Sequence, residues 1–394
     1  MTVKIAERMN RMAPSGIRKV NEKALAMERA GERVLHFELG RPDFDTPEYI
    51  KKAAWEALEA GKVHYTSNFG LMELREAIAA KLLRENQVSY KPTEVLVTVG
   101  LSEAVMAVLA TLLNPGDENF GAGSGLVKLH QRTPIFWAQK PVTYSLKEEN
   151  GYQLDIEEIH SKVTAKTKAI VIVTPNNPTG GVLTRDVLQQ LADIAIQNDL
   201  MVVADEVYER LLYDDAEHVS IASLPGMKEH TFTLNGMSKA YAMDGWRLGY
   251  VAAPEEYILA MNKFHQHNTT CAPNFVQVAG AAALNQEGDE VEEMVKEYKR
   301  RRDYAVKAIN AIPGISCQCP KGAFYIFINC KSLGMKSAEL SAYLLENAKI
   351  ALVPGDVFGP GGEGYLRLSF AASYDSIVEG CQKLKEAVAA LQKN

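Results

Sequence analysis

From about residue 45 to residue 290, short apolar runs alternate with longer stretches whose apolar residues recur at helical spacing. The apolar runs predict buried strands, and the periodic stretches between them predict helices. A chain that alternates in this way is typical of an α/β fold, with a largely parallel sheet covered by helices on both faces. The clearest strands are expected at 95–99, 169–174, 200–205, 231–234 and 247–253, and the clearest helices at 47–60, 71–85, 102–113, 184–198 and 255–267.

Both ends of the chain predict additional units. The first 40 or so residues have the character of an arm followed by a helix, and a long, charged, periodic stretch at about 286–311 leads into a C-terminal unit. A chain of 394 residues with 47% hydrophobic content can bury a large core and allows two domains. The C-terminal unit is expected to have strands at 324–329 and 365–370 and helices at 336–348 and 375–392. We therefore expect an arm and part of a small domain at 1–45, a large domain at 46–290 and a small domain at 291–394.

The composition argues against several classes of protein. A net charge of −6 does not favour a nucleic-acid partner. The first ten residues lack the apolar core of a signal peptide, and the longest apolar runs are too short to span a membrane. Five cysteines, an odd number without metal-ligand spacing, are expected to be reduced. These features predict a cytoplasmic protein without a metal site.

One lysine stands in an informative setting. Lys239 lies in a small, turn-prone stretch, and Arg247 follows eight residues later at the start of an apolar strand. A lysine in a partly dry pocket can lose its proton and form a Schiff base with an aldehyde, and an arginine offers a planar fork for a phosphate. Together they indicate pyridoxal phosphate, which carries both groups. Because a lone lysine is usually solvated, the interpretation depends on three further segments.

Two of these segments follow predicted strands with polar residues. Asn177 lies in the loop at 174–181, where its amide can donate to a phenolate oxygen, although the loop taken alone is better explained as a plain turn. Asp205 ends an apolar run, and a carboxylate there is costly without a charged partner. A pyridinium N–H would be such a partner and would make the ring a better electron sink. Tyr208 can reach the ring hydroxyl. The alternative for Asp205 is a cap on the next helix.

The third segment joins a strand to a helix through Gly100, Leu101 and Ser102. Free N–H groups at a helix start, together with a hydroxyl, suit a phosphate. Many α/β proteins share this feature, so on its own it indicates little.

In order and spacing, the four segments resemble the class I and II aminotransferases of the fold-type-I pyridoxal-phosphate superfamily. Further matches along nearly the whole chain are 39–44, Tyr65-Thr66 with Gly70, Leu74-Arg75, 321–325 and 365–369. The resemblance implies a large domain with a mostly parallel seven-stranded sheet, a smaller α+β domain, and a homodimer with shared active sites.

The resemblance also implies roles for individual residues. Lys239 would form the Schiff base and then move the proton, Asp205 would pair with the pyridine nitrogen, and Asn177 and Tyr208 would bond the ring oxygen. The remaining roles are phosphate binding by Arg247, Ser102 and the Leu101 amide, with Ser238 as a weaker candidate; contact with the neighbouring subunit's phosphate by Tyr65; and binding of the substrate α-carboxylate by Arg367, helped by Gly40 and Asn177. Relatives often carry a hydroxyl three residues before the lysine, where this chain has Gly236.

One segment departs from the family pattern. Relatives carry a Pro-x-Pro-Gly-aromatic-x-x-Tyr motif whose aromatic ring stacks on the pyridine, whereas this chain is rich in glycine at 119–131 and places Leu126 where the aromatic should be. A real glycine-rich loop is one explanation. A compensated frameshift is another, because a one-base shift permits Trp at position 126 and Tyr at position 129. Residues 119–139 are therefore expected to be the weakest part of the chain.

The reaction implied is the transfer of an amino group from an L-amino acid, of the aspartate or aromatic type, to a 2-oxo acid. Two alternatives remain open at this point. A C–S β-lyase on the same fold would use the same Schiff-base residues and release ammonia and pyruvate. A non-catalytic, cofactor-binding or regulatory relative is disfavoured because Lys239 and Asp205 are both retained.

Overall fold

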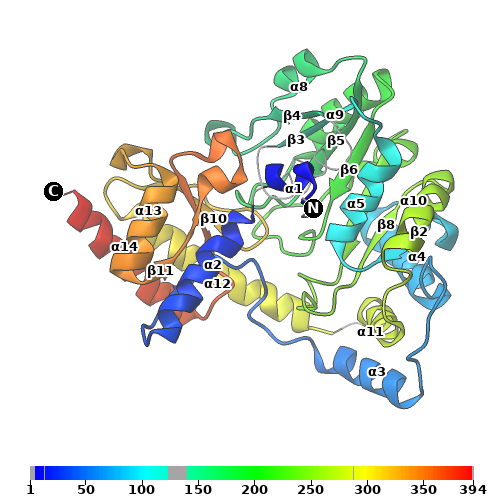
Figure 1. Cartoon of the computed structure of the whole chain (residues 1–394), viewed down its shortest axis with the longest axis horizontal. Helices are drawn as coiled ribbons and strands as arrows, with labels where there is room; N and C mark the ends of the chain where they lie inside the picture. Colours follow the sequence, from blue (N-terminus) through cyan, green and yellow to red (C-terminus); the bar gives the residue numbers. More distant parts are fainter. Residues whose placement is uncertain (1–4, 13, 123–139, 287, 393–394) are drawn as a thin grey trace, which may run out of the picture.

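The computed structural model describes residues 5–12, 14–122, 140–286 and 288–392. A seven-stranded sheet forms the centre of its larger unit (Figure 1). Its strands lie in the order β2-β8-β7-β6-β5-β3-β4. Strand β8 is antiparallel to both of its neighbours, and the other neighbouring pairs are parallel. The predicted α/β class with a mostly parallel seven-stranded sheet is confirmed. The strands are β2 Val95–Thr98, β3 Glu118–Ala122, β4 Lys140–Tyr144, β5 Thr167–Val173, β6 Met201–Asp205, β7 Thr231–Gly236 and β8 Gly249–Ala252.

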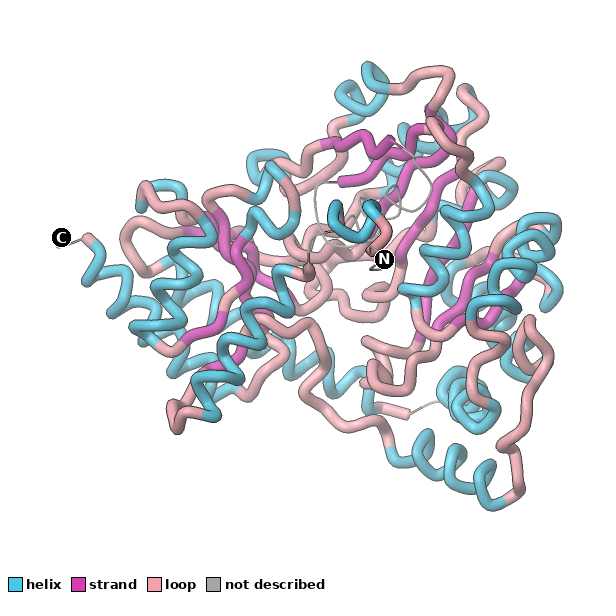
Figure 2. Tube along the Cα trace, viewed as in Figure 1, coloured by secondary structure: helices cyan, strands magenta, loops and turns pink. Residues whose placement is uncertain are grey.

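Helices cover both faces of this sheet because successive strand residues point to opposite sides. Along β5, Ile170 and Ile172 pack with Leu188 and Leu191 of α9. Between them, Val171 packs into the cluster formed with α5 and α10 on the other face. The result is the three-layer arrangement visible in Figures 1 and 2. The helices on these two faces are α5 Leu101–Leu112, α8 Ile156–Lys162, α9 Arg185–Gln197 and α10 Glu255–Asn268.

The β2–β8 edge of the sheet is covered by three more helices. Val97 and Tyr250 are buried there with Leu74 of α4 and Val276 of α11, and α3 packs against α11. The helices are α3 Glu48–Glu59, α4 Met72–Asn86 and α11 Asn274–Asn285.

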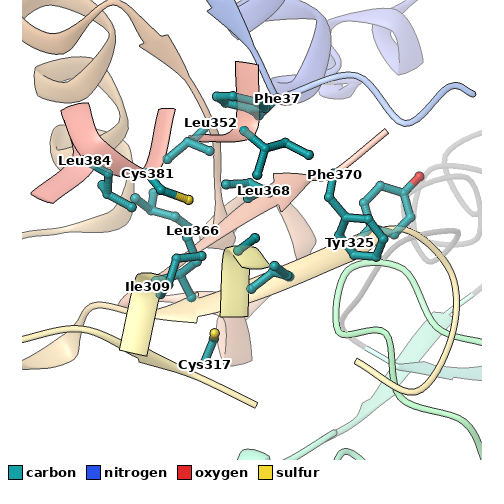
Figure 3. Close-up of a cluster of buried hydrophobic side chains, with 14 of the residues drawn as sticks. Phe37, Ile309, Cys317, Tyr325, Leu352, Leu366, Leu368, Phe370, Cys381 and Leu384 are labelled. Carbon is teal, nitrogen blue, oxygen red and sulfur yellow. The ribbon is translucent and has the colours of Figure 1, made fainter. Parts of the chain in front are cut away.

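A smaller unit follows α12, and its core lies between a sheet and helices (Figure 3). Antiparallel strands β9, β10, β12 and β13 form this sheet, and β1 pairs in parallel with β11. Figure 3 shows Phe37, which follows β1, on the same apolar cluster as Leu352 and Leu368. The N-terminal strand therefore packs with the C-terminal part of the chain. The elements of this unit are α2 Gly16–Arg29, β1 Leu35–His36, α12 Glu290–Asn310, β9 Ser316–Cys317, β10 Tyr325–Asn329, α13 Ser337–Tyr343, β11 Ile350–Ala351, β12 Val353–Pro354, β13 Tyr365–Ser369 and α14 Tyr374–Leu391. The short helix α1 Glu7–Arg11 precedes them in the chain.

Most of the expected strands and helices lie within a few residues of the observed ones. Strands β3 and β4 were not expected individually, because the glycine-rich segment hides the first and the second is partly exposed. The helix expected at 336–348 ends at Tyr343 and continues as a π-helical turn, Leu344–Ala348. The domain boundaries at 45 and 290 remain predictions.

Among the residues that the structure describes, no helix is both long and apolar enough to cross a membrane. The five cysteines are all free thiols, and three of them, Cys317, Cys330 and Cys381, are buried.

Candidate active site

The carboxyl ends of four strands, β2, β5, β6 and β7, open onto a cavity of about 170 Å³. Ligands of open α/β sheets bind at this edge. Eight of the eleven predicted site residues line the cavity; the exceptions are Gly40, Tyr65 and Arg367. The lining consists of Leu101, Ser102, Val173, Asn177, Asp205, Val207, Tyr208, Ser238, Lys239, Asp244 and Arg247.

Lys239 follows β7 and is partly buried. Its Nζ donates to the carbonyl of Gly40 at 2.6 Å and lies about 6 Å from the ring centroids of Tyr208 and Phe324. Burial lowers the pKa of Lys239 to about 8, against the opposing effect of the nearby Asp244 carboxylate. An amine with this pKa has an appreciable neutral, nucleophilic fraction near neutral pH.

Asp205 ends β6 and is almost fully buried, with 1% of its surface exposed. One carboxylate oxygen, Oδ1, accepts from the Val207 amide at 3.1 Å. The other, Oδ2, is buried without a hydrogen-bond partner among the described residues. Burial raises the pKa of Asp205 to about 7, and the charge of Glu206 adds to the rise. A buried acceptor in this state is suited to a cationic N–H donor from a ligand.

Tyr208 and Tyr325 form a buried pair, with their hydroxyl oxygens 2.8 Å apart. Their rings meet edge to face, with centroids 5.7 Å apart. Burial raises the pKa of both phenols, so both are neutral hydrogen-bonding groups at physiological pH. The Tyr325 ring also lies 4.5 Å from the Arg367 guanidinium. This pair therefore connects the cavity at the sheet edge with the arginine of the smaller unit.

The start of α5 forms a compact cradle with Arg247. Gly100 precedes the helix with φ of +74°, and a Cβ there would lie 2.3 Å from Arg247 Nη2, so glycine is required for this close approach. Arg247 itself has φ of +56°, and its Nη1 donates to the Asp244 carbonyl at 2.9 Å. The exposed Ser102 lies in the first turn. Free helix N–H groups beside a guanidinium suit a phosphate.

Arg367 extends from β13 and is buried, with 1% of its surface exposed. Its Nη1 donates to Asn177 Oδ1 at 2.9 Å, and its Nη2 donates to the Glu38 carbonyl at 2.5 Å. Its Nε has no partner among the described residues. Desolvation lowers the pKa of Arg367, but an arginine remains charged. A fixed, buried guanidinium next to a lysine-bearing cavity can bind a carboxylate.

Two predicted features lie away from this cluster. Tyr65 is 86% exposed and is not among the residues that line the cavity of this chain. Leu126 and Leu129, on which the frameshift hypothesis rests, lie outside the described residues. Gly236 occupies the place of the family's additional hydroxyl, and a Cβ there would lie 2.8 Å from the Leu248 carbonyl and 2.9 Å from Leu101.

Sequence reasoning gave no role to several residues of the site. Tyr325 belonged to a matched segment, 321–325, and that match was the only signal for it. Glu38 and Asp244 are adjacent to matched motifs, but their contacts with Arg367 and Arg247 run through backbone carbonyls, which a sequence does not reveal.

Two other features of the structure resemble functional sites: a second cavity and a cluster of metal-ligating residue types. A larger cavity of about 490 Å³ lies between the 179–185 loop and the 318–321 turn, and none of the predicted site residues line it. Glu206, Glu209 and His218 lie close enough to hold a metal ion. The Lys81 ammonium, however, already pairs with Glu209. We therefore interpret this group as a buried ion-pair network.

Comparison with known proteins identifies the family. The family described as aminotransferase class I and II matches residues 32–384. The chain belongs to this family. It is 44% identical to an aspartate aminotransferase of Pyrococcus abyssi and 42% identical to aromatic-amino-acid aminotransferase 2 of Thermococcus litoralis, in both cases over 98% of each chain. The solved structure of Thermus thermophilus aspartate aminotransferase with maleate superimposes with a TM-score of 0.93 at 36% identity, covering 98% of this chain and 100% of that one. The protein is an aminotransferase.

The class I and II aminotransferases use pyridoxal phosphate, and the cavity fits that group. The unpartnered Oδ2 of Asp205 is an acceptor for a pyridine N–H. The cradle of Gly100 and Arg247 suits the phosphate, and the partly neutral amine of Lys239 suits the aldehyde.

Proposed function

We propose that this aminotransferase moves the amino group of an L-amino acid, of the aspartate or aromatic type, to a 2-oxo acid, with pyridoxal phosphate as its cofactor. The observation that carries the proposal is the shared cavity of Lys239 and Asp205, one an amine with a lowered pKa and the other a buried carboxylate with an unused oxygen. The names of the relatives support the choice of donors.

Each end of the cofactor has a candidate group in the cavity. Lys239 would hold it covalently at the aldehyde, and Asp205 would accept from the ring N–H. Arg247, Ser102 and the Leu101 N–H would bind the phosphate, with the Ser238 hydroxyl nearby. Asn177 and Tyr208 would bond the ring oxygen. When bound, the cofactor supplies an electron sink that stabilises negative charge at the substrate α-carbon.

The protein's own groups then bind the substrate and move the proton. Arg367 would bind the α-carboxylate as a planar fork, and its contacts with Asn177 and the Glu38 carbonyl fix its direction. Lys239, displaced from the Gly40 carbonyl, would take the proton from the substrate α-carbon and return it at another position. The ionised Asp205 would keep its ring N–H partner charged throughout. Gly40 would help Arg367 to bind the carboxylate.

A screen of amino donors tests this proposal. Purified protein with added cofactor is offered aspartate, aromatic and aliphatic amino acids with 2-oxoglutarate as acceptor, and ammonia is measured in parallel. We expect stoichiometric amino transfer from aspartate or an aromatic donor without ammonia. Release of ammonia and pyruvate from cystathionine-like donors, without amino transfer, would instead identify a β-lyase.

We also propose a homodimer with shared active sites, located in the cytoplasm. Tyr65 is 86% exposed, and its apolar neighbours Val63 and Trp55 are 59% and 61% exposed. Such a group of exposed apolar side chains is unusual on the surface of a monomer. Mixing inactive Lys239→Ala chains with Tyr65→Ala chains should restore part of the activity, since one hybrid site keeps both residues. No recovery in confirmed heterodimers would exclude sharing through Tyr65. The free cysteines fit a reducing compartment.

A further inference from the structure

The segment from His36 to Gly40 contacts both charged groups of the proposed reaction. The carbonyl of Glu38 accepts from Arg367 Nη2 at 2.5 Å, and the carbonyl of Gly40 accepts from Lys239 Nζ at 2.6 Å. The conformation of this segment therefore affects where both the arginine and the lysine point. Both contacts are made by backbone carbonyls of the segment, so the Glu38 carboxylate is available for other interactions.

That carboxylate is completely buried and takes part in a small charged cluster. Glu38 Oε1 accepts from Asn21 Nδ2 of α2 at 2.8 Å and lies 2.8 Å from His36 Nδ1. The other ring nitrogen of His36, Nε2, lies 3.1 Å from Glu28 Oε1, also on α2. Glu38 Oε2 is buried without a partner among the described residues. Phe37, between His36 and Glu38 in the chain, lies in the core of the smaller unit (Figure 3).

The charges of the cluster bear on Arg367. A buried carboxylate whose charge reaches a buried guanidinium attracts it and competes with any anion that the guanidinium binds. The Glu38 charge also acts on the pKa of Arg367. A protonated His36 beside Glu38 cancels most of this competing charge. If His36 is neutral, the negative charge of Glu38 remains uncompensated beside the arginine.

We propose that the buried carboxylate of Glu38 and the partly exposed His36 form an ion pair that controls how tightly Arg367 binds the substrate α-carboxylate. Glu38 fixes the carbonyl that orients the guanidinium, and His36 removes the charge that would oppose the incoming anion. His36 and Glu38 are thus positioning residues, since neither touches the reacting atoms. The inference rests on the proposed function, in which Arg367 is the carboxylate receptor.

The pair is sensitive to pH because His36 titrates. Its hydrogen bond to Glu38 raises the pKa of His36 to about 9, and Glu28 adds to the rise. Two carboxylates face His36: Glu38 on its own segment and Glu28 on α2. Asn21, also on α2, donates to Glu38. His36 stays protonated through neutral pH and loses its charge as the pH rises through about 9. Substrate affinity is expected to fall in the same range.

Four proteins test the proposal: wild type, His36→Gln, the double variant His36→Gln/Glu38→Gln, and Glu379→Gln as control. Glu379 of α14 binds Arg33, a residue of the N-terminal region, bidentately, but this pair is exposed and includes none of the site residues. At pH 7.5 we expect His36→Gln to raise KM for both amino and 2-oxo acids about tenfold, with kcat within about threefold. The double variant, which removes the uncompensated charge, should recover most of the loss, and Glu379→Gln should match wild type.

Two further measurements guard against a folding artefact. In wild type alone, KM should rise about tenfold as the pH increases from 8 to 10, and the double variant should lose this rise. Histidine NMR of the cofactor-free protein should show one ring, absent from His36→Gln, that titrates near pH 9 and shifts toward 6.5 in Glu38→Gln.

A KM of His36→Gln within twofold of wild type, or a double variant no better than the single one, would overturn the proposal. So would a His36 ring that titrates near 6.5 in the wild type. If wild type transaminates no donor, the proposed function fails instead, and the NMR titration still decides whether the ion pair exists.

Discussion

Asp205 is the last residue of β6 and Glu209 lies in the turn that follows it, yet the two carboxylates have opposite surroundings. Asp205 faces the cavity with an unpartnered oxygen, and its pKa is raised to about 7 by burial. Glu209 faces the other way, where it accepts from Asn86 and Asn235 and pairs with Lys81. These partners outweigh desolvation and lower the pKa of Glu209 to about 2.

This contrast separates a group reserved for a ligand from a group used for folding. A buried carboxylate with every oxygen satisfied contributes to stability, whereas one with an unused oxygen costs stability until a ligand arrives. Residues on the cavity side should therefore affect activity far more than folding, and residues on the network side should do the reverse.

The largest effect on activity is expected for Lys239→Ala. This change removes both the covalent anchor and the proton carrier, and general acid–base catalysis alone contributes about 10²- to 10⁴-fold. We expect transamination to fall by at least about a thousandfold, together with loss of the visible absorbance of bound cofactor. Turnover near that of wild type in single-donor assays would mean that another residue is the amine.

Asp205→Ala should come next. Loss of a buried charge partner costs roughly 3–5 kcal/mol, which corresponds to a fall in kcat of several hundredfold or more. Stability at neutral pH should not fall and should rise, because the buried carboxylate has no hydrogen-bond partner for Oδ2 in the free protein. Steady-state kinetics and urea unfolding check the two parts separately, and a loss of activity below tenfold would contradict the role.

Arg367→Lys should have an intermediate effect, confined to substrate binding. An ammonium cannot reproduce the planar fork that contacts Asn177 and the Glu38 carbonyl. We expect KM for amino acids to rise about tenfold to a hundredfold, while decarboxylated amines are affected much less. Equal weakening of both would show that Arg367 does not receive the carboxylate.

Lys81→Met should have the smallest effect on activity and a large effect on stability. It leaves Glu209 buried without its cation, at a cost of roughly 3–5 kcal/mol in the free energy of unfolding. The folded enzyme should keep kcat within about threefold. Lys23→Met is the matched control, since Lys23 and its partner Glu346 are 47% and 57% exposed, and it should cost under about 1 kcal/mol. Loss of activity without loss of stability would reverse the assignment.

Local sequence patterns were sufficient to predict the residues on the cavity side of this contrast. Lys239, Asp205 and Arg247 lie in or next to segments whose residue types already indicate their chemistry, and their strands and helices follow from apolar periodicity. The α/β class with a mostly parallel sheet was predictable for the same reason.

Long-range contacts explain what the sequence could not reveal. Glu209 meets Lys81 from 128 residues earlier, and Arg367 meets the Glu38 carbonyl across 329 residues. Such pairings depend on how α4, β13 and the N-terminal segment pack, and no local pattern records that. The role of Tyr325 was hidden likewise, because its partner Tyr208 is 117 residues away.

The pH dependence of unfolding tests the contrast most directly. An acid whose folded pKa is raised costs stability once the unfolded chain has ionised, so Asp205 should make the cofactor-free protein less stable as the pH rises from about 4 to about 7, by on the order of 4 kcal/mol. Glu209, with a lowered folded pKa, contributes stability above about pH 4.5 that is lost as the pH falls toward about 2.

The measurement is urea unfolding of the cofactor-free wild type, Asp205→Asn and Glu209→Gln between pH 4 and 8. The account predicts that Asp205→Asn is more stable than wild type at pH 7.5 and lacks its fall between pH 4 and 7, while Glu209→Gln is less stable at pH 7.5. Equal destabilisation by both substitutions would contradict it.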